Sequence, residues 1–402
     1  MLKSSNTRRL ALSVAVMAAA VTPLFAGSAS ADPKQLGALV GVGSDTTQDV
    51  LNAMAGNSNN VPYTPITSSS ASGARQVISF DATPPVGVAD NCISPKVGGP
   101  TFDRPNGSTN GRAALSRALD GTKWGSAACG GLADLGGIVD FARSSSGPAS
   151  GDTGTTLTYV PFGRDAVSFA YYRAGGAGGP VTSLTRPQLT TLFTTGTLSV
   201  SNGTESVNII ACGIQTGSGT FKFWNTVTTA STSLENTATT TCNNLGGTGR
   251  LQENDAAGLK AKGDLAASGT QVVVGFSAAN FVAKSNGVAD GNPAPLSVGL
   301  GSISDNGAGV NLGSPISGSA PNVAANATFY NSSIFGRNVY NVLPSAIISG
   351  GGNFDIKTMF VGSTSAVCSA NAVIVQFGYL SLGAGCGTTT TKGSLIVGQA
   401  NV

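Results

Sequence analysis

Short apolar segments of this chain are followed by small hydroxyl residues and then by a helical pattern. Leu39 to Val42 precedes GSDTTQDVLNAMAG, in which Val50, Leu51 and Met54 share one helical face. Residues 271–276, QVVVGF, lead into SAANFVAK in the same way. Strands that alternate with helices favour an α/β fold, and we expect mostly parallel strands.

The composition fits a packed fold that is rich in turns. The chain has 56 glycines and 18 prolines, yet its hydrophobic fraction of 41% is enough for a core. Residues 159–162 and 166–172 each have the pattern of a strand. No repeat of 20 to 50 residues is present, so a solenoid or a propeller is not favoured.

The first 31 residues have the features of a cleavable signal peptide. Three basic residues come before an apolar run from about Leu10 to Val21, and small residues lead to Ala31. The run of about 12 residues is too short to cross a bilayer, which needs about 20. We expect cleavage before Asp32, by the Sec or the twin-arginine route, and no membrane span. Because no cysteine precedes Cys92, we expect release or non-covalent retention at the cell surface.

Charge and cysteine content limit the possible functions. Loss of residues 1–31 would remove three of the 22 basic residues and none of the 19 acidic ones, leaving 19 of each. This balance does not favour nucleic acid as a partner. The six cysteines allow 15 pairings, and we expect each to bond to its neighbour in the sequence, Cys92 to Cys129, Cys212 to Cys242 and Cys368 to Cys386.

The chain contains no histidine. A Ser-His-Asp or Cys-His catalytic arrangement therefore cannot form, and no S-x-x-K motif offers a Ser-Lys alternative. Without histidine or a C-x-x-C pair, a zinc site is not expected either. We expect a protein that is not an enzyme and that needs no cofactor and no metal.

The strongest local signal for a ligand is the segment TGSGTFKFWNTV, residues 216–227. Its glycines and hydroxyls come directly before a helical pattern, where unpaired N–H groups and the helix dipole favour an oxyanion. A plain serine N-cap is the structural alternative. Three other junctions share this design, so we predict an anion site formed by Ser44, Asp45, Thr46, Ser70, Arg143, Ser144, Ser145, Ser218, Gly219 and Thr220.

The order of these segments resembles the phosphate-binding protein of bacterial phosphate ABC transporters, particularly its actinobacterial relatives. The resemblance rests on GVGSDTTQDVL, SSSASGARQ, IVDFARSSSGP, YVPFGRDAVSFAYY, LTRPQLTTLF, TGSGTFKFW, VVVGFSAANFVA and FGRNVYNVLP, in that order. It implies a type II periplasmic-binding fold, with a first domain of residues 32–163 and 336–402, a second of residues 164–335, and two crossing strands between them. It also implies capture of phosphate or a similar oxyanion in the cleft, and an ABC permease as partner.

The match to that family's ligand-binding residues is partial. Ser218, Gly219 and Thr220 match its Ser-Gly-Thr, and Ser70 falls near an expected serine. The family's arginine corresponds to Ile214, and its aspartate to Ser145. Arg143 or Arg75 could replace the guanidinium, and Asp45 could replace the carboxylate that accepts a proton from the ligand.

Three alternatives follow from these departures. If Asp45 points elsewhere, the site has donors only and suits a fully ionised anion such as sulfate as well as phosphate. A secreted surface or matrix protein of the same fold that binds a glycan or a macromolecule is a second alternative. A secreted enzyme is the third and is the least favoured, because histidine is absent.

Overall fold

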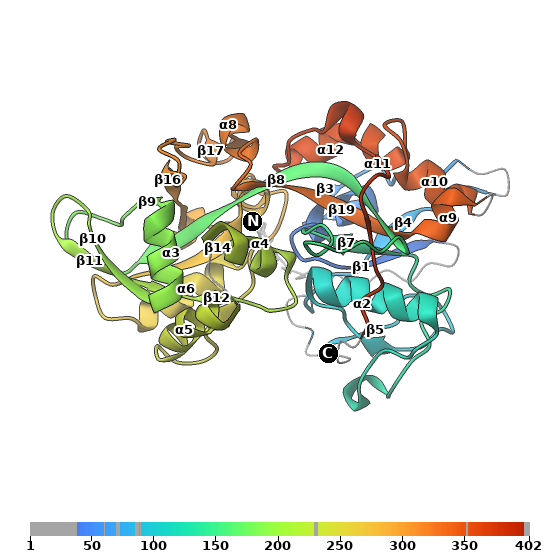
Figure 1. The fold of residues 1–402 in the computed structure, drawn as a ribbon, viewed down its shortest axis with the longest axis horizontal. Helices are drawn as coiled ribbons and strands as arrows, with labels where there is room; N and C mark the ends of the chain where they lie inside the picture. The colour runs from blue at the N-terminus through green and yellow to red at the C-terminus, as the bar shows by residue number, and fades with distance from the viewer. Residues whose placement is uncertain are drawn as a thin grey trace, which may run out of the picture.

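The computed structural model describes residues 38–59, 61–69, 73–84, 88, 90–228, 232–350 and 353–397. Both the predicted signal peptide and Ser70 lie outside this part of the chain. Figure 1 shows two lobes side by side, with helices packed around a sheet that passes through both. Among the described residues, no helix is long and apolar enough to span a membrane.

The lobes are joined by two long strands of opposite direction. Strand β8 (Leu157–Arg173) pairs along its first part with β19 (Gly336–Pro344) and along its second part with β14 (Gln271–Ser277), antiparallel in both cases. Figure 1 shows β8 arching from one lobe to the other. We call residues 38–166 and 336–397 the first lobe, and residues 167–335 the second.

The central sheet is mixed, with the order β10-β11-β14-β8-β19-β7-β1-β4. Only β1–β4, β1–β7 and β11–β14 pair in parallel along this path. The expectation of mostly parallel strands was therefore wrong at the centre of the sheet. The reason is that the chain leaves the first lobe along β8 and returns beside it along β19, so these neighbours run in opposite directions.

Helices cover the sheet in both lobes. In the first lobe the elements are β1 (Leu39–Gly43), β4 (Val77–Ser79), β7 (Phe141–Ser144), α1 (Gln48–Met54), α2 (Gly107–Asp120), α9 (Ser345–Ser349), α10 (Phe354–Phe360), α11 (Ala366–Ser369) and α12 (Asn371–Gln376). In the second lobe they are β10 (Thr197–Ser201), β11 (Ser206–Ala211), α3 (Arg186–Thr195), α4 (Gly219–Thr228), α5 (Thr232–Asn243), α6 (Ala256–Leu265), α7 (Ala278–Ser285) and α8 (Ala327–Tyr330).

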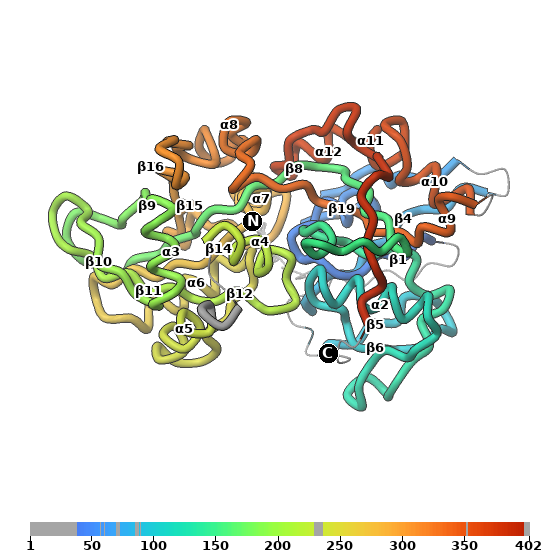
Figure 2. The backbone as a smooth tube through the Cα atoms, viewed as in Figure 1, coloured from blue at the N-terminus to red at the C-terminus, as the bar shows by residue number. Residues whose placement is uncertain are grey.

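Short strands complete the structure. They are β2 (Asn57–Ser58), β3 (Val61–Pro62), β5 (Cys92–Ile93), β6 (Phe102–Asp103), β9 (Ser183–Thr185), β12 (Gly213–Ile214), β13 (Arg250–Leu251), β15 (Gly299–Leu300), β16 (Ser302–Asp305), β17 (Ile316–Ser317), β18 (Ala324–Ala325) and β20 (Lys392–Gly393). The C-terminal segment, red in Figure 2, runs over the first lobe to α2, where Ile396 N donates to Ser116 Oγ at 2.9 Å.

Each lobe has its own hydrophobic core, and one helix belongs to both. The second lobe packs around Phe169, Phe193 and Trp224. The first lobe has two clusters, one of them around Phe141 and Phe162. Helix α7 supplies side chains to the cores of both lobes. Helix α7 therefore lies where the two lobes meet and packs against both of them.

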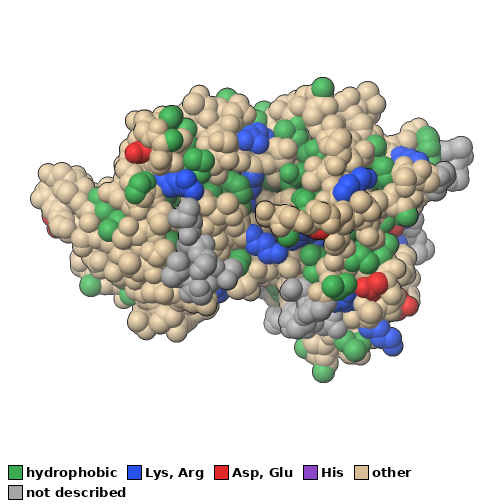
Figure 3. Space-filling model, in the orientation of Figure 1, with side chains coloured by type: hydrophobic (Ala, Val, Ile, Leu, Met, Phe, Trp, Pro, Cys, Tyr) green, Lys and Arg blue, Asp and Glu red, His purple; other side chains and the backbone are tan. Residues whose placement is uncertain are grey.

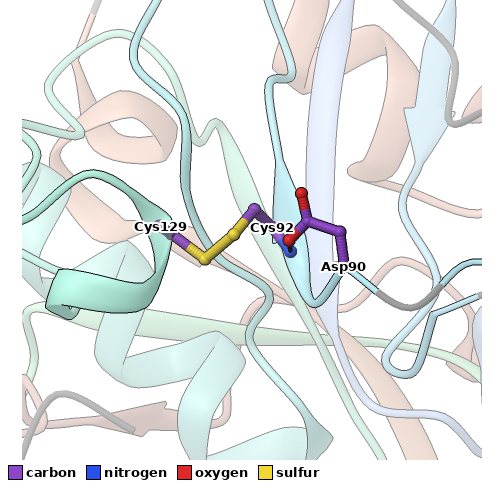
Figure 4. A group of neighbouring side chains, drawn as sticks. All are labelled: Asp90, Cys92 and Cys129. Carbon is purple, nitrogen blue, oxygen red and sulfur yellow. Dashed lines mark hydrogen bonds between the residues drawn. A yellow bond between two sulfur atoms is a disulfide. The ribbon is translucent and has the colours of Figure 1, made fainter.

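All six cysteines form disulfides between neighbours in the sequence, Cys92–Cys129, Cys212–Cys242 and Cys368–Cys386. The predicted pairing is confirmed. Asp90 lies beside the first bond, as Figure 4 shows. Because both sulfurs of this group are already bonded to each other, neither can act as a thiolate ligand, and the group is not a metal site.

Candidate functional site

Polar side chains from both lobes meet at one buried place between them. The loop after β1 and strand β19 approach from the first lobe, and the first turn of α4 and the segment after β13 from the second. All of these side chains are at most 5% exposed. We call this group the enclosed cluster, which consists of Ser44, Asp45, Thr46, Thr220, Glu253 and Arg337.

Direct hydrogen bonds join the two lobes within the enclosed cluster. Thr46 Oγ1 donates to Glu253 Oε1 at 2.8 Å, and Thr220 Oγ1 donates to the same oxygen at 3.2 Å. The two threonine hydroxyls are 3.3 Å apart. Thr46 belongs to the first lobe and its partners to the second, so the lobes are closed against each other here.

Arg337 is held in place by a carboxylate on the neighbouring crossing strand. Its Nε and Nη2 lie 3.1 and 2.8 Å from Asp165 Oδ2, and Nη2 also donates to Thr220 Oγ1 at 2.7 Å. Asp165 additionally accepts from Ser277 Oγ and Ala279 N, both at 3.0 Å. The guanidinium therefore sits on the strands that connect the lobes and reaches the start of α4.

Two buried carboxyl groups lie next to each other in the cluster. Burial, and then the neighbouring Glu253, raise the pKa of Asp45 well above its ordinary value. Among the described residues, neither Asp45 Oδ2 nor Glu253 Oε2 has a hydrogen-bond donor. Asp45 therefore favours its neutral form, because an ionised carboxylate there would be buried and would face a second carboxyl group.

Several buried polar atoms at the lobe junction have no hydrogen-bond partner among the described residues. Besides the two carboxyl oxygens, they are Ser44 Oγ, Thr109 Oγ1, Ser146 Oγ and Arg337 Nη1. A buried polar atom without a partner costs about 1–3 kcal/mol, so native structures contain few of them. Donors and acceptors gathered in this way at one place are typical of a ligand site.

The N-terminus of α4 faces this junction. Ser218 Oγ accepts from the backbone N–H groups of Thr220 at 2.9 Å and Phe221 at 3.2 Å, so Ser218 caps the helix. A Cβ atom on Gly219 would lie 2.5 Å from Ser145 Oγ and 2.6 Å from Ser108 Oγ. Glycine is thus required for the close approach of the two lobes.

The serines after β7 have different environments. Ser145 contacts α2, because its N–H donates to Ser108 Oγ at 2.9 Å and the two hydroxyls are 3.2 Å apart. Ser144 Oγ instead donates to the carbonyl of Ser146 at 2.7 Å, within its own turn. Ser145 therefore lies at the lobe junction, and the hydroxyl of Ser144 stabilises the loop.

Arg143 is not part of the enclosed cluster. Its guanidinium donates to the carbonyl oxygens of Gly41, Gly43 and Ser44 at 3.1–3.3 Å and to Ser79 Oγ at 2.7 Å. All three of its nitrogens are therefore engaged within the first lobe, where they hold the loop after β1. Arg75, the other suggested replacement, donates to the carbonyl of Ala38 at 2.6 Å.

The sequence analysis did not select three residues that lie at the junction, Arg337, Asp165 and Glu253. Arg337 and Asp165 lie in two of the segments that carry the resemblance, FGRNVYNVLP and YVPFGRDAVSFAYY, and these two segments form the crossing strands. A charged residue inside an otherwise apolar strand could have marked both. Glu253 lies in LQENDAAGL, where no local pattern distinguishes it from a surface residue.

An open groove of about 1020 Å³ lies beside the enclosed cluster. Its walls come from both lobes and its base from the crossing strands, and Arg337 and Ser145 line it as well. The other charged residues of its lining are Arg112, Arg164, Lys222 and Asp152. Figure 3 shows Lys and Arg side chains between the two lobes. The groove is therefore mainly cationic.

Comparisons with known proteins give similarity to solved structures only. No family model matches the chain, and no curated protein matches it. A phosphate ABC transporter substrate-binding protein from Clostridium perfringens, solved with bound phosphate, is 11% identical; 86% of this chain and 99% of that chain are covered, with a TM-score of 0.45.

Two further solved structures are similar to the same degree. A phosphate transport receptor from Vibrio cholerae is 13% identical over 85% of this chain and 99% of its own, with a TM-score of 0.41. A phosphate-binding protein from Stenotrophomonas maltophilia is 15% identical over 76% and 78%, with a TM-score of 0.38.

Proposed function

We propose that this protein is a non-catalytic solute-binding protein that captures a small oxyanion, with phosphate as the leading candidate, between its two lobes. The observation that carries the proposal is the enclosed cluster, where the N-terminus of α4, the loop after β1 and the Arg337 guanidinium converge with unpartnered buried polar atoms. Hydroxyls, backbone N–H groups and a guanidinium are the donors that oxyanions require.

The carboxyl pair favours a protonated oxyanion over sulfate. A fully ionised sulfate has no proton to offer to a carboxylate, so any carboxylate that stays ionised in this buried site would repel it. Hydrogen phosphate can donate its proton to one of these carboxylates. The sulfate alternative depended on a site without acceptors, and the unpartnered oxygens of Asp45 and Glu253 support phosphate over it.

Capture requires the lobes to separate. The contacts of Thr46 with Glu253 and Thr220 would open, as would the hydrogen bond from Arg337 to Thr220, and the bending would occur along β8 and β19, which connect the lobes. We retain residues 32–163 with 336–402, and residues 164–335, as the proposed moving domains. The proposed binding residues are Ser44, Asp45, Thr46, Ser145, Ser218, Gly219, Thr220, Glu253 and Arg337, with Ser70 retained from the resemblance.

The proposed setting is outside the cytoplasm. Three disulfides fit an oxidising compartment, and the first 31 residues have the pattern of a signal peptide. An ABC permease is the proposed partner, since solved structures of similar fold are described as substrate-binding proteins of phosphate transporters.

Titration of the purified protein with phosphate and with sulfate tests this proposal, by calorimetry and by the fluorescence of Trp224. This buried tryptophan lies one helical turn after Thr220. We expect one phosphate per chain, weaker binding of sulfate, and a fluorescence change on closure. Thr220→Val should weaken phosphate binding at least tenfold, because a hydroxyl bonded to charged groups is lost. Thr191→Val, on the exposed face of α3, is the matched control.

Binding of neither anion at millimolar concentration would exclude the proposed function. The surface-protein alternative would then be favoured, and a glycan array would be the next measurement. Equal effects of the two threonine substitutions would show that Thr220 stabilises the fold and does not contact the ligand.

A further inference from the structure

Two cations from opposite lobes line the groove. Arg112 lies on α2 in the first lobe and Lys222 on α4 in the second, and both line the groove. Among the described residues, no salt bridge involves either one, and Lys222 Nζ has no hydrogen-bond partner. Burial, and then the charge of Arg112, lower the pKa of Lys222 to about 8. The two charges therefore repel each other in the closed form.

Each of these cations keeps a free donor. Arg112 Nε donates to Ser108 O at 3.1 Å and Nη1 to Tyr159 Oη at 2.8 Å and Gly147 O at 3.4 Å, whereas Nη2 has no partner among the described residues. The acid of the groove lining, Asp152, accepts from the N–H and hydroxyl of Ser394 and from Gly154 N at 2.7–2.9 Å. It is thus already engaged.

The groove cations lie about one helical turn beyond the contact between α2 and α4. Ser108 and Gly219 mark that contact, and Arg112 and Lys222 follow them by four and three residues on the respective helices. One turn is about 5.4 Å. Arg337 connects the two places, because it donates to Thr220 and also lines the groove. The donors therefore continue from the enclosed cluster into the groove.

We propose that Arg112 and Lys222 bind a second phosphoryl group, so that the preferred ligand is a condensed phosphate, such as diphosphate or a short polyphosphate, with one end at the enclosed cluster. The inference rests on the proposed function, since the first phosphoryl group occupies the site proposed there. An anion between the two cations would replace their repulsion with attraction. An uncharged organic substituent on phosphate would leave that repulsion in place.

Competitive titration of the purified protein with orthophosphate, diphosphate and glycerol phosphate tests the proposal, after exhaustive dialysis to remove bound anions. We expect diphosphate to bind at least tenfold more tightly than orthophosphate or the monoester, because it gains two charge-assisted contacts. Lys222→Gln should lower the affinity for diphosphate about tenfold more than that for orthophosphate. Lys123→Gln, an exposed lysine outside the groove, makes the same charge change and should alter neither affinity.

The outcomes separate the two proposals. Orthophosphate binding with no preference for diphosphate, or equal losses for both ligands in Lys222→Gln, would overturn the groove site and leave the proposed function standing. A monoester that binds as tightly as diphosphate would also overturn it. Binding of none of the three would overturn both proposals. Because the Lys222 side chain lines the open groove and has no partner among the described residues, its substitution should leave the fold intact, and near-ultraviolet circular dichroism can verify this.

Discussion

The enclosed cluster and the groove lie next to each other and share Arg337, yet they differ in chemistry. The cluster is buried, contains two carboxyl groups, and closes the lobes through direct hydrogen bonds. The groove is open, mainly cationic, and keeps free donors on both walls. Under the proposed function, the enclosed cluster would recognise the ligand and the groove would attract its charge.

Burial determines how strongly each region responds to a change. Interactions between charges are stronger in a buried place than in a solvated one, and salt screens the solvated ones further. Substitutions in the enclosed cluster should therefore alter stability and selectivity, whereas those in the groove should act mainly on attraction of the ligand.

The largest effect is expected for Arg337→Met. This change leaves Asp165 buried without its cationic partner, which typically costs about 3–5 kcal/mol. Urea unfolding followed by fluorescence would measure the loss of stability. Lys222→Met also replaces a cation by methionine, but in the groove. It should shift the unfolding free energy by less than about 0.5 kcal/mol. Equal shifts would contradict the distinction between the two regions.

The second effect concerns pH. Folding raises the pKa of Asp45, so the folded state keeps a proton that the unfolded state releases above the ordinary value of 3.8. The contribution of Asp45 to stability should therefore be present at low pH and be lost as pH rises, by up to about 1.4 kcal/mol per unit. Burial raises the pKa of Asp49 from 3.8 to about 6. The contribution of Asp49 to stability should therefore also be lost as the pH rises between these two values.

Asp45→Asn isolates the contribution of the carboxyl pair. Unfolding free energies of both proteins, measured at intervals from pH 4 upward, should fall less steeply in the variant. Identical slopes would mean that Asp45 is ionised in the folded protein.

A smaller effect is expected for Gly219→Ala. The added methyl group would meet Ser145 Oγ at 2.5 Å and Ser146 N at 2.9 Å, across the lobe junction. Overpacking of this kind costs about 1–3 kcal/mol, and here only the closed form carries the cost. Phosphate affinity should fall about tenfold or more, and small-angle scattering should show a more open molecule. Gly385→Ala, where the nearest atom would be at 3.8 Å, is the control.

The smallest effect is a change in reactivity at Lys222. With a pKa of about 8, half of these side chains are neutral at pH 8, whereas an ordinary lysine with a pKa of about 10.4 is almost fully charged. Brief acetylation followed by peptide mapping should label Lys222 faster in the folded protein than in the unfolded one. Slower labelling on folding would contradict the repulsion from Arg112.

Local patterns predicted which loops lie at the lobe junction more reliably than the side chains that contact them. The junctions at Ser44–Thr46 and Ser218–Thr220 follow from strand, hydroxyl and helix signals within about ten residues, and the structure brings Thr46 and Thr220 within 3.3 Å. Arg143 had the expected charge and position, but backbone carbonyls surround it. The direction of those carbonyls depends on how β1 pairs with β7, which the sequence does not reveal.

Long-range pairing explains the other differences. Residues 159–162 and 166–172 have the pattern of two strands, yet they form one strand, β8, because β19 and β14 pair with its successive parts. Glu253 lies in the cluster because β13, two residues before it, pairs with β12. The residues around Glu253 in the sequence do not predict this pairing. The disulfides were predictable because each joins cysteines that are neighbours in the sequence.

That disulfide pattern has a consequence for how the chain is made. Each cysteine bonds to the next one along the chain, across 37, 30 and 18 residues. As the polypeptide emerges from its N-terminal end, every pair is therefore complete before the first cysteine of the following pair appears. Oxidation in order of emergence yields the native set directly, and no bond has to be exchanged for another.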